Sequence, residues 1–232
     1  MKIESFIKRL NATELGEGVT NDTYIAIPRD VDLSQMLENR QAMTIFDRVE
    51  GILYTPENSN IKYVQTGQNK QERISGLGRY FRRVGANVGD EILIEKVEDG
   101  DRCILYLDFN HRDVIVFQKN KDWVEILTPQ RMEPYKTGKD YLMDVIFQNE
   151  RVKLYVKYLG QKMKKKTSPA DTAAYDLLID SKSILPNYEY LDYIEISNRD
   201  ADRRLARMKT YMLSLIDTMN AGDKNELLYS DS

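Results

Sequence analysis

The sequence predicts a mainly β protein of the α+β class, with a smaller α+β region after residue 118. Short segments rich in β-formers recur at regular spacing through the first 118 residues, and residues typical of tight turns separate them. One or two short helical segments interrupt this series. Many short strands with few helices are typical of a closed or nearly closed β-barrel.

In the first half of the chain, the alternation of apolar and polar residues predicts the strands. Pro28 ends the second strand, because proline cannot donate the amide hydrogen bond of a sheet ladder. Glu50 and Gly51 predict a turn inside the third β segment. Short helices are expected over residues 32–37 and 80–84. The expected strands cover residues 5–10, 23–28, 43–54, 91–97, 102–108 and 113–118.

The second half predicts further strands and then one long helix. Alternate apolar residues from Val152 to Tyr158 indicate a strand over 151–159, and others are expected over 123–127, 141–147, 175–180 and 190–196. Ser197 and Asp200 have the spacing of a capping box. Apolar residues three or four apart then predict a helix over 198–220. Its stripe comprises Ala201, Leu205, Met208, Met212, Leu215 and Met219.

Composition favours a folded protein of the cytoplasm. Of the 232 residues, 41% are hydrophobic and 31% are charged, which is not the balance of a disordered chain. No apolar run approaches the ~20 residues that cross a bilayer, and the first 15 residues lack the apolar core of a signal peptide. Cys103 is the single cysteine and His111 the single histidine, so a structural zinc site lacks ligands. We expect no membrane contact.

The most informative segment is a basic island on an acidic chain. Residues 62–83 carry six basic residues against one acidic residue, Glu72, a local balance of +5, whereas the whole chain carries −3. Arginine and lysine can pair with guanine, glutamine or asparagine with adenine, and glutamate with cytosine, as major-groove readout requires. A solvated polar loop is the alternative interpretation. The polar arm contains Lys62, Gln65, Gln68, Asn69, Lys70, Gln71, Glu72 and Arg73.

Three blocks of the first 118 residues resemble two related groups of DNA-binding domains. The first block is FIKRL at residues 6–10 followed, after a glycine-bearing loop, by YIAIP at 24–28. The second is KQERI at 70–74, and the third combines the arm at 67–70, a short helix at 78–81 and a Gly-Asp turn at 89–92. These blocks are similar to the N-terminal effector-binding domain of the restriction endonuclease EcoRII and to the plant B-three-type transcription-factor domain.

The resemblance implies a DNA-binding pseudobarrel whose two arms grip the major groove. The first arm would span residues 11–24 and the second residues 62–73. The implied base-reading residues are Asn21, Asp22, Thr23, Gln68, Asn69, Lys70, Glu72 and Arg73, with Tyr24, Gln65 and Gln71 in the same arms. The implied phosphate contacts are Lys8, Arg9, Lys62 and Arg79, and the implied structural residues are Tyr80, Phe81, Val84, Gly89 and Asp90.

The chain also departs from the EcoRII pattern. That family carries a histidine where this chain has residues 19–21, and a basic residue where it has Glu72. A different DNA target is therefore expected. The resemblance ends near residue 118, so it implies nothing for residues 119–232.

A metal-dependent nuclease core is the catalytic alternative. Asp180 and Lys182 follow the apolar run 177–179, with Asp171 or Asp176 upstream, and clustered carboxylates of this kind could hold Mg²⁺. Short Asp-x-Lys matches are common by chance in a highly charged chain. We therefore interpret Asp180 as a turn residue at the end of a strand. Nuclease types that need several histidines are excluded, because His111 is alone.

The expected function is sequence-specific recognition of double-stranded DNA in a restriction system for phage defence, with no cofactor. The chain would be a specificity module, or the DNA-reading region of a longer restriction protein. Its further partners would be other restriction subunits or a C-terminal motor or nuclease domain. Two alternatives remain: a compact Mg²⁺-dependent type II restriction endonuclease with its catalytic residues in 119–232, and a protein-interaction barrel.

Overall fold

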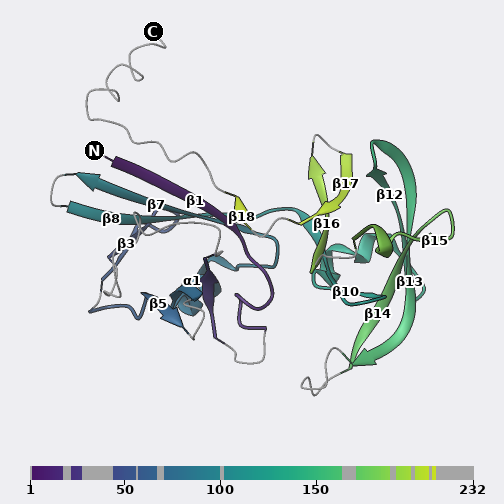
Figure 1. Cartoon of the computed structure of the whole chain (residues 1–232), viewed down its shortest axis with the longest axis horizontal. Helices are drawn as coiled ribbons and strands as arrows, with labels where there is room; N and C mark the ends of the chain where they lie inside the picture. Colours follow the sequence, from purple (N-terminus) through teal and green to yellow (C-terminus); the bar gives the residue numbers. More distant parts are fainter. Residues whose placement is uncertain are drawn as a thin grey trace, which may run out of the picture. The chain divides into compact units, whose positions relative to one another are not determined.

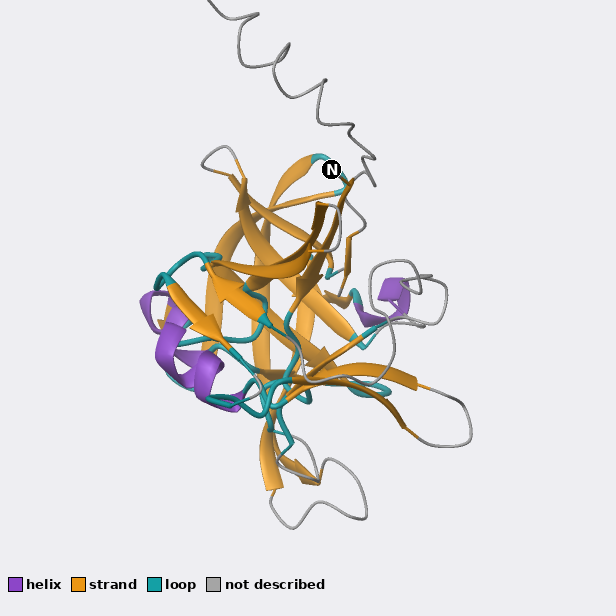
Figure 2. Ribbon diagram, turned by 90° about the vertical axis from the view of Figure 1, so that its left-hand side faces the viewer, coloured by secondary structure: helices purple, strands orange, loops and turns teal. Residues whose placement is uncertain are grey.

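The protein is mainly β. A computed structural model describes residues 2–17, 22–27, 44–55, 57–66, 71–99, 102–163, 171–188, 192–199, 202–208 and 211–212. Strands dominate these residues, and α1 (Gly78–Val84) is their single α-helix (Figure 2). None of the helices in these ranges has both the length and the apolar character needed to cross a membrane.

The chain divides into two compact units. The first comprises residues 1–86, 90–111 and 210–232, and the second comprises residues 87–89 and 112–209. β9 (Val114–Lys119) belongs to the second unit, where it pairs with β10 (Val124–Ile126) and β16 (Tyr193–Arg199). The division therefore falls before β9, whereas the boundary expected after residue 118 falls near the end of this strand. Sequence spacing does not reveal which strands pair.

The first unit packs two sheets around one core (Figure 1). A six-stranded sheet has the order β18-β1-β7-β8-β3-β4, and a three-stranded sheet has the order β2-β6-β5. Phe6, Ile74 and Tyr80 show how both sheets and α1 contribute to the same apolar cluster. The strands are β1 (Lys2–Arg9), β2 (Tyr24–Ala26), β3 (Ile45–Asp47), β4 (Ile52–Tyr54), β5 (Lys62–Thr66), β6 (Gln71–Ser75), β7 (Glu91–Asp99), β8 (Arg102–Asn110) and β18 (Tyr211–Met212).

Local sequence signals predicted β1 to β4, β7 and β8, but not β5, β6 or β18. The expected strands near residues 5–10, 23–28, 91–97 and 102–108 are confirmed, as is the short helix around Tyr80. The expected turn at Glu50 and Gly51 joins β3 to β4. The Asp47 carboxylate accepts the backbone N–H of Val49 at 2.9 Å and of Glu50 at 3.3 Å, which satisfies donors that the turn leaves unpaired. The helix expected over residues 32–37 lies outside the described residues.

A buried ion pair connects β1 to the turn that follows it. Lys8 Nζ lies 3.1 Å from Glu14 Oε1, and both side chains are almost fully buried. The same carboxylate accepts the backbone N–H of Ala26 at 2.9 Å and of Asn11 at 3.2 Å. Burial raises the pKa of Glu14, while Lys8 and these donors act to lower it. Glu14 thus binds β1, the turn and β2 to one another.

The second unit is a closed ring of seven strands. Their order is β10-β9-β16-β17-β12-β13-β14, and β14 pairs with β10 to close the ring. All neighbours are antiparallel except β12 and β17, which are parallel. Strand directions must alternate around a fully antiparallel ring, and an odd number of strands cannot alternate throughout. One parallel neighbour pair is therefore unavoidable.

Apolar side chains at alternate positions of the strands fill the inside of this ring. Leu154 and Val156 of β13 are buried, and Val152 and Tyr158 pack against the same core, as their spacing predicted. The remaining strands of the ring are β12 (Asp140–Phe147), β13 (Glu150–Met163), β14 (Asp171–Ile179) and β17 (Asp202–Arg207). Two short strands, β11 (Lys136–Thr137) and β15 (Lys182–Ser183), extend it, and the 3-10 turns are η1 (Pro129–Arg131), η2 (Glu133–Tyr135) and η3 (Leu185–Tyr188).

The prediction of a long helix over residues 198–220 is wrong for the part that the structure describes, including residues 211–212, which form β18. Residues 202–207 form β17, which pairs with β16 from Arg199↔Asp202 to Ile194↔Arg207. Leu205 and Met208 are both buried, but the ladder to β16 satisfies the backbone and sets the conformation. The α+β region expected after residue 118 thus contains 3-10 turns and no α-helix within its described part. Residues 213–220 lie outside that part.

Removing one member of the buried pair should destabilise the protein more than removing both. Lys8→Met leaves the buried Glu14 carboxylate without its counter-ion, and such a loss costs about 3–5 kcal/mol. The double variant Lys8→Met/Glu14→Gln removes both charges and should recover much of this stability. Urea unfolding of the wild type and the variants measures the difference.

The exposed pair Lys153–Asp144, with a separation of 3.0 Å, provides the matched control. Lys153→Met should change the unfolding free energy by less than about 1 kcal/mol, because water already solvates both charges. Equal losses for Lys8→Met and Lys153→Met would contradict the role given to the buried pair.

Candidate nucleic-acid interface

The three-stranded sheet carries the predicted second arm. β5 and β6 form an antiparallel hairpin, and β2 pairs with the other edge of β6. Ile25, Tyr63 and Ile74 face the core from this sheet and are buried. Since side chains alternate along a strand, Lys62, Arg73 and Tyr24 lie on the opposite face. The base of the hairpin is thereby anchored in the core, while the other face carries the exposed Lys62, the half-buried Arg73 and the buried Tyr24.

Arg73 is held against an aromatic ring. Its guanidinium carbon lies 4.1 Å from the centre of the Tyr24 ring, close enough for a cation–π interaction. Ala26 pairs with Arg73 and Tyr24 pairs with Ser75, so the two side chains are diagonal neighbours on one face. The ring restricts the orientation of the guanidinium. Arg73 therefore links the end of the predicted first arm to the second arm.

Helix α1 places arginines beside this hairpin. Tyr80 and Phe81 bury their rings in the core, which turns Arg79 and Arg82 outward, where both are exposed. Arg83 instead donates to Tyr54 Oη at 2.8 Å. The helix ends at Val84 and is capped by Gly85, which has φ 64°, a left-handed conformation that glycine adopts without strain.

The first arm meets α1 at Gly78. A Cβ on Gly78 would lie 2.7 Å from Thr23 Oγ1 and 3.4 Å from Arg82 Nη1, so both side chains lie against this glycine. Asp22 precedes Thr23 and is exposed. The described end of the first arm, the start of α1 and the base of the hairpin are consequently neighbours.

Strand pairing separates the predicted base-reading residues. Tyr24 pairs with Ser75 at the base of the hairpin, so Asp22 and Thr23 lie at that end. Gln71 begins β6 at the opposite end, four residues away, or about 13 Å at 3.3 Å per residue. Glu72 is two residues from the buried Ile74 on β6, so it lies on the core-facing side of the sheet, whereas Arg73 lies on the opposite side. Asn21, Gln68, Asn69 and Lys70 lie outside the described residues, as do the side chains of Gln65 and Gln71.

Two of the predicted phosphate contacts are engaged inside the protein. Lys8 is 3% exposed and bound to Glu14, so its ammonium group cannot reach a phosphate, and we correct that prediction. Arg9 donates from Nε to Glu91 Oε1 at 2.9 Å on the neighbouring strand β7. The sequence missed these pairings, because Glu14 and Glu91 become neighbours of β1 only in the folded chain. Lys62 and Arg79 are exposed, as a phosphate contact requires.

The weak catalytic candidates lie in a hairpin turn. Asp180 and Ser181 have φ of 50° and 64° and join β14 to β15, so Asp180 is the strand-end turn residue expected from the sequence. Lys182 begins β15 and is exposed. The part of the chain that the structure describes brings together no group of acidic, histidine or cysteine side chains that could hold a metal ion.

Comparison with known proteins does not assign the chain to a family. No protein-family model matches the chain, and no curated protein matches it significantly.

Gly76→Ala should destabilise the first unit strongly. Gly76 has φ +87°, and an added Cβ would lie 2.2 Å from the backbone oxygen of Asn60, so the loop before β5 would have to move. We expect the unfolding free energy in urea to fall by more than about 2 kcal/mol, because the cost of the strained φ and the cost of the backbone clash add together. Gly85→Ala is the matched control, since Gly85 has φ +64° but no atom within 4 Å. A smaller loss for Gly76→Ala than for Gly85→Ala would contradict the close approach.

Proposed function

We propose that the protein binds double-stranded DNA sequence-specifically, through the β5–β6 hairpin and helix α1, as part of a restriction system. The observation that carries this proposal is the group of exposed cations at the base of the hairpin: Lys62, Arg79 and Arg82. Among the described residues, these three form no ion pair. The resemblance of residues 1–118 to the EcoRII and B-three-type domains adds a known mode of DNA binding for such a hairpin.

The cations at the hairpin base differ from others in the same unit. Arg9 pairs with Glu91, Arg48 pairs with Glu95, and Lys8 pairs with Glu14, so these charges are already balanced within the fold. The charges of Lys62, Arg79 and Arg82 remain available to phosphate. Neutralising phosphates releases counterions, which supplies affinity without sequence preference. This local attraction can operate although the chain carries −3 overall.

Specificity would come from the same sheet. Arg73, oriented by Tyr24, can make the bidentate contact that guanine accepts in the major groove. Asp22 and Thr23 would read from the first-arm side. In this proposal the two sheets of the first unit form the pseudobarrel that aims the arms.

The wider setting follows from the same resemblance. A restriction role would place the protein in the cytoplasm with DNA, other restriction subunits or a C-terminal motor or nuclease domain as partners. DNA binding itself would need no cofactor. Mg²⁺ would enter only with the nuclease alternative, and the turn position of Asp180 offers that alternative no support.

Lys62→Ala and Arg79→Ala should each weaken binding to all DNA sequences about equally. Each removes one phosphate contact, so the slope of log affinity against log salt concentration should fall by about 1. Fluorescence anisotropy with a selected and a scrambled duplex, at several salt concentrations, measures both effects. Lys157→Ala, an exposed lysine on β13, is the matched control. Wild-type protein that binds neither duplex at low salt would refute DNA binding.

Arg73→Ala should instead change sequence preference. Loss of one bidentate base contact should cost about 1–3 kcal/mol on the preferred duplex and relax the preference at one base pair. Arg73→Lys keeps the charge but lacks the planar fork, so it should relax the preference as well. Binding selections from random duplexes would show this. An unchanged preference in both variants would exclude Arg73 from base reading.

A further inference from the structure

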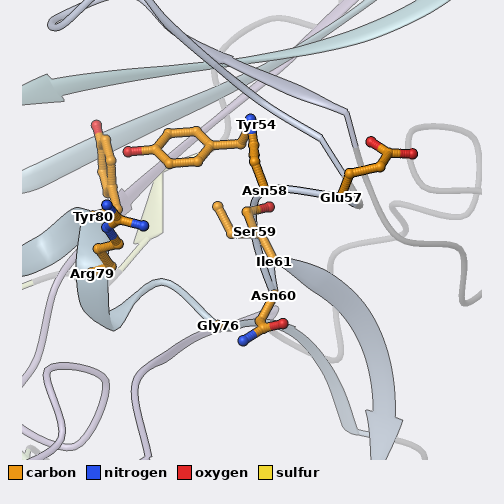
Figure 3. A pocket seen from close by; sticks show the side chains of 9 residues that line it. All are labelled: Tyr54, Glu57, Asn58, Ser59, Asn60, Ile61, Gly76, Arg79 and Tyr80. Atoms are coloured by element: carbon orange, nitrogen blue, oxygen red, sulfur yellow. The ribbon is translucent and has the colours of Figure 1, made fainter.

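A polar pocket lies at the base of the β5–β6 hairpin. It has a volume of about 260 Å³ and lies between the loop 57–61, Gly76, Tyr54 and the start of α1. Figure 3 shows the Tyr54 ring and the Arg79 and Tyr80 side chains on one side of it, with Asn60 on another, while the Glu57 carboxylate points away. All of its lining residues belong to the first unit.

The position of the pocket follows from the hairpin. The loop 57–61 leads directly into Lys62, the first residue of β5, and Gly76 directly follows Ser75, the last residue of β6. Lys62 and Ser75 are paired, so both chain segments that leave the hairpin base contribute to the lining of the pocket. Gly76 approaches Asn60 so closely that no side chain fits between them. The pocket therefore adjoins the exposed cations of the proposed DNA interface.

Several polar groups of the lining are already engaged. Asn58 accepts the N–H of Thr55 at 2.8 Å and donates to the carbonyl of Leu53 at 3.0 Å. Ser59 Oγ donates to the carbonyl of Thr55 at 3.1 Å. These bonds shape the loop and leave little capacity for a ligand.

Three other groups retain hydrogen-bonding capacity. The Asn60 amide and the Arg79 guanidinium have no hydrogen-bond partner among the described residues. Tyr54 Oη accepts from Arg83, which leaves its own O–H to donate. Burial raises the pKa of the Tyr54 phenol, which favours the protonated form that can donate.

This set of groups suits a small planar ligand with donors and acceptors on its edge. The volume is slightly below the roughly 300–1,000 Å³ of pockets for drug-sized ligands. An amide can both donate and accept, as a nucleobase edge requires, and Arg79 could reach the attached phosphate. Ile61, Tyr54 and Tyr80 form the apolar part of the lining, and their side chains are almost fully buried behind it.

We propose that this pocket receives a single nucleobase turned out of the DNA duplex. The inference rests on the proposed DNA binding and assigns a ligand to a pocket beside that interface. Turning out a base costs a few kcal/mol of lost pairing and stacking, and the cost is least for a base that is already unpaired. Duplexes that contain such a base should therefore bind more tightly than fully paired ones.

The test compares a selected duplex with the same duplex carrying one extra unpaired base, placed at each position in turn and with each of the four bases. Wild-type protein should bind at least one such duplex about ten-fold more tightly than the paired duplex. Asn60→Trp, which fills the pocket, should abolish this preference. Asn60→Ala, which removes only the amide, should weaken binding of the best unpaired duplex by about 2–10-fold. Asn187→Trp and Asn187→Ala, at an exposed asparagine of the second unit, are the matched controls.

The outcomes separate the two proposals. Equal affinity of the wild type for paired and unpaired duplexes would overturn the pocket assignment and leave DNA binding in place. A preference that Asn60→Trp retains would also overturn it. Failure to bind any duplex at low salt would overturn both. Circular dichroism of each variant, compared with the wild type, establishes that it is folded.

Discussion

The buried contact between Lys8 and Glu14 is the constraint on which the proposed interface depends. A charge enclosed by protein must find a partner there, because the loss of hydration costs several kcal/mol. Glu14 meets this demand with Lys8 on β1 and with the amides of Asn11 and Ala26. The backbone N–H of Tyr24 also donates to the carbonyl of Glu14, at 3.1 Å. Together these bonds fix where β2 begins, and β2 in turn aligns Tyr24 with the hairpin.

Local patterns were sufficient for most strands but not for their partners. Alternation located β1, β7, β8 and β13. Tyr80 and Phe81 were expected to be structural residues, and both are buried. The helix expected from Leu205 and Met208 was wrong, because a spacing of three residues also fits a strand: Leu205 lies in β17, and Met208 directly follows the end of that strand. What decides between these structures is the ladder to β16, and no local signal describes a ladder.

The proposed site shows the same division between local and long-range information. Residue types marked the stretch from Lys62 to Arg83 as basic, and Lys62 and Arg79 are indeed exposed. Lys8 looked equally suitable from its sequence, but its partner is six residues away and visible only after folding. Arg82, beside Thr23 at Gly78, was counted in the basic island yet not chosen, since a helix face cannot be assigned from so short a segment.

The ring of the second unit has two narrow junctions. A single residue pair, Ile146↔Arg204, joins β12 to β17, and a single pair, Val124↔Tyr175, joins β10 to β14. Each of the other neighbouring pairs has at least three paired residues. Backbone hydrogen bonds thus hold β12, β13 and β14 together as one panel and the other four strands as a second panel. The two panels are joined chiefly by the apolar side chains between them. Local opening of this unit would therefore begin with separation of β12 from β17 and of β10 from β14.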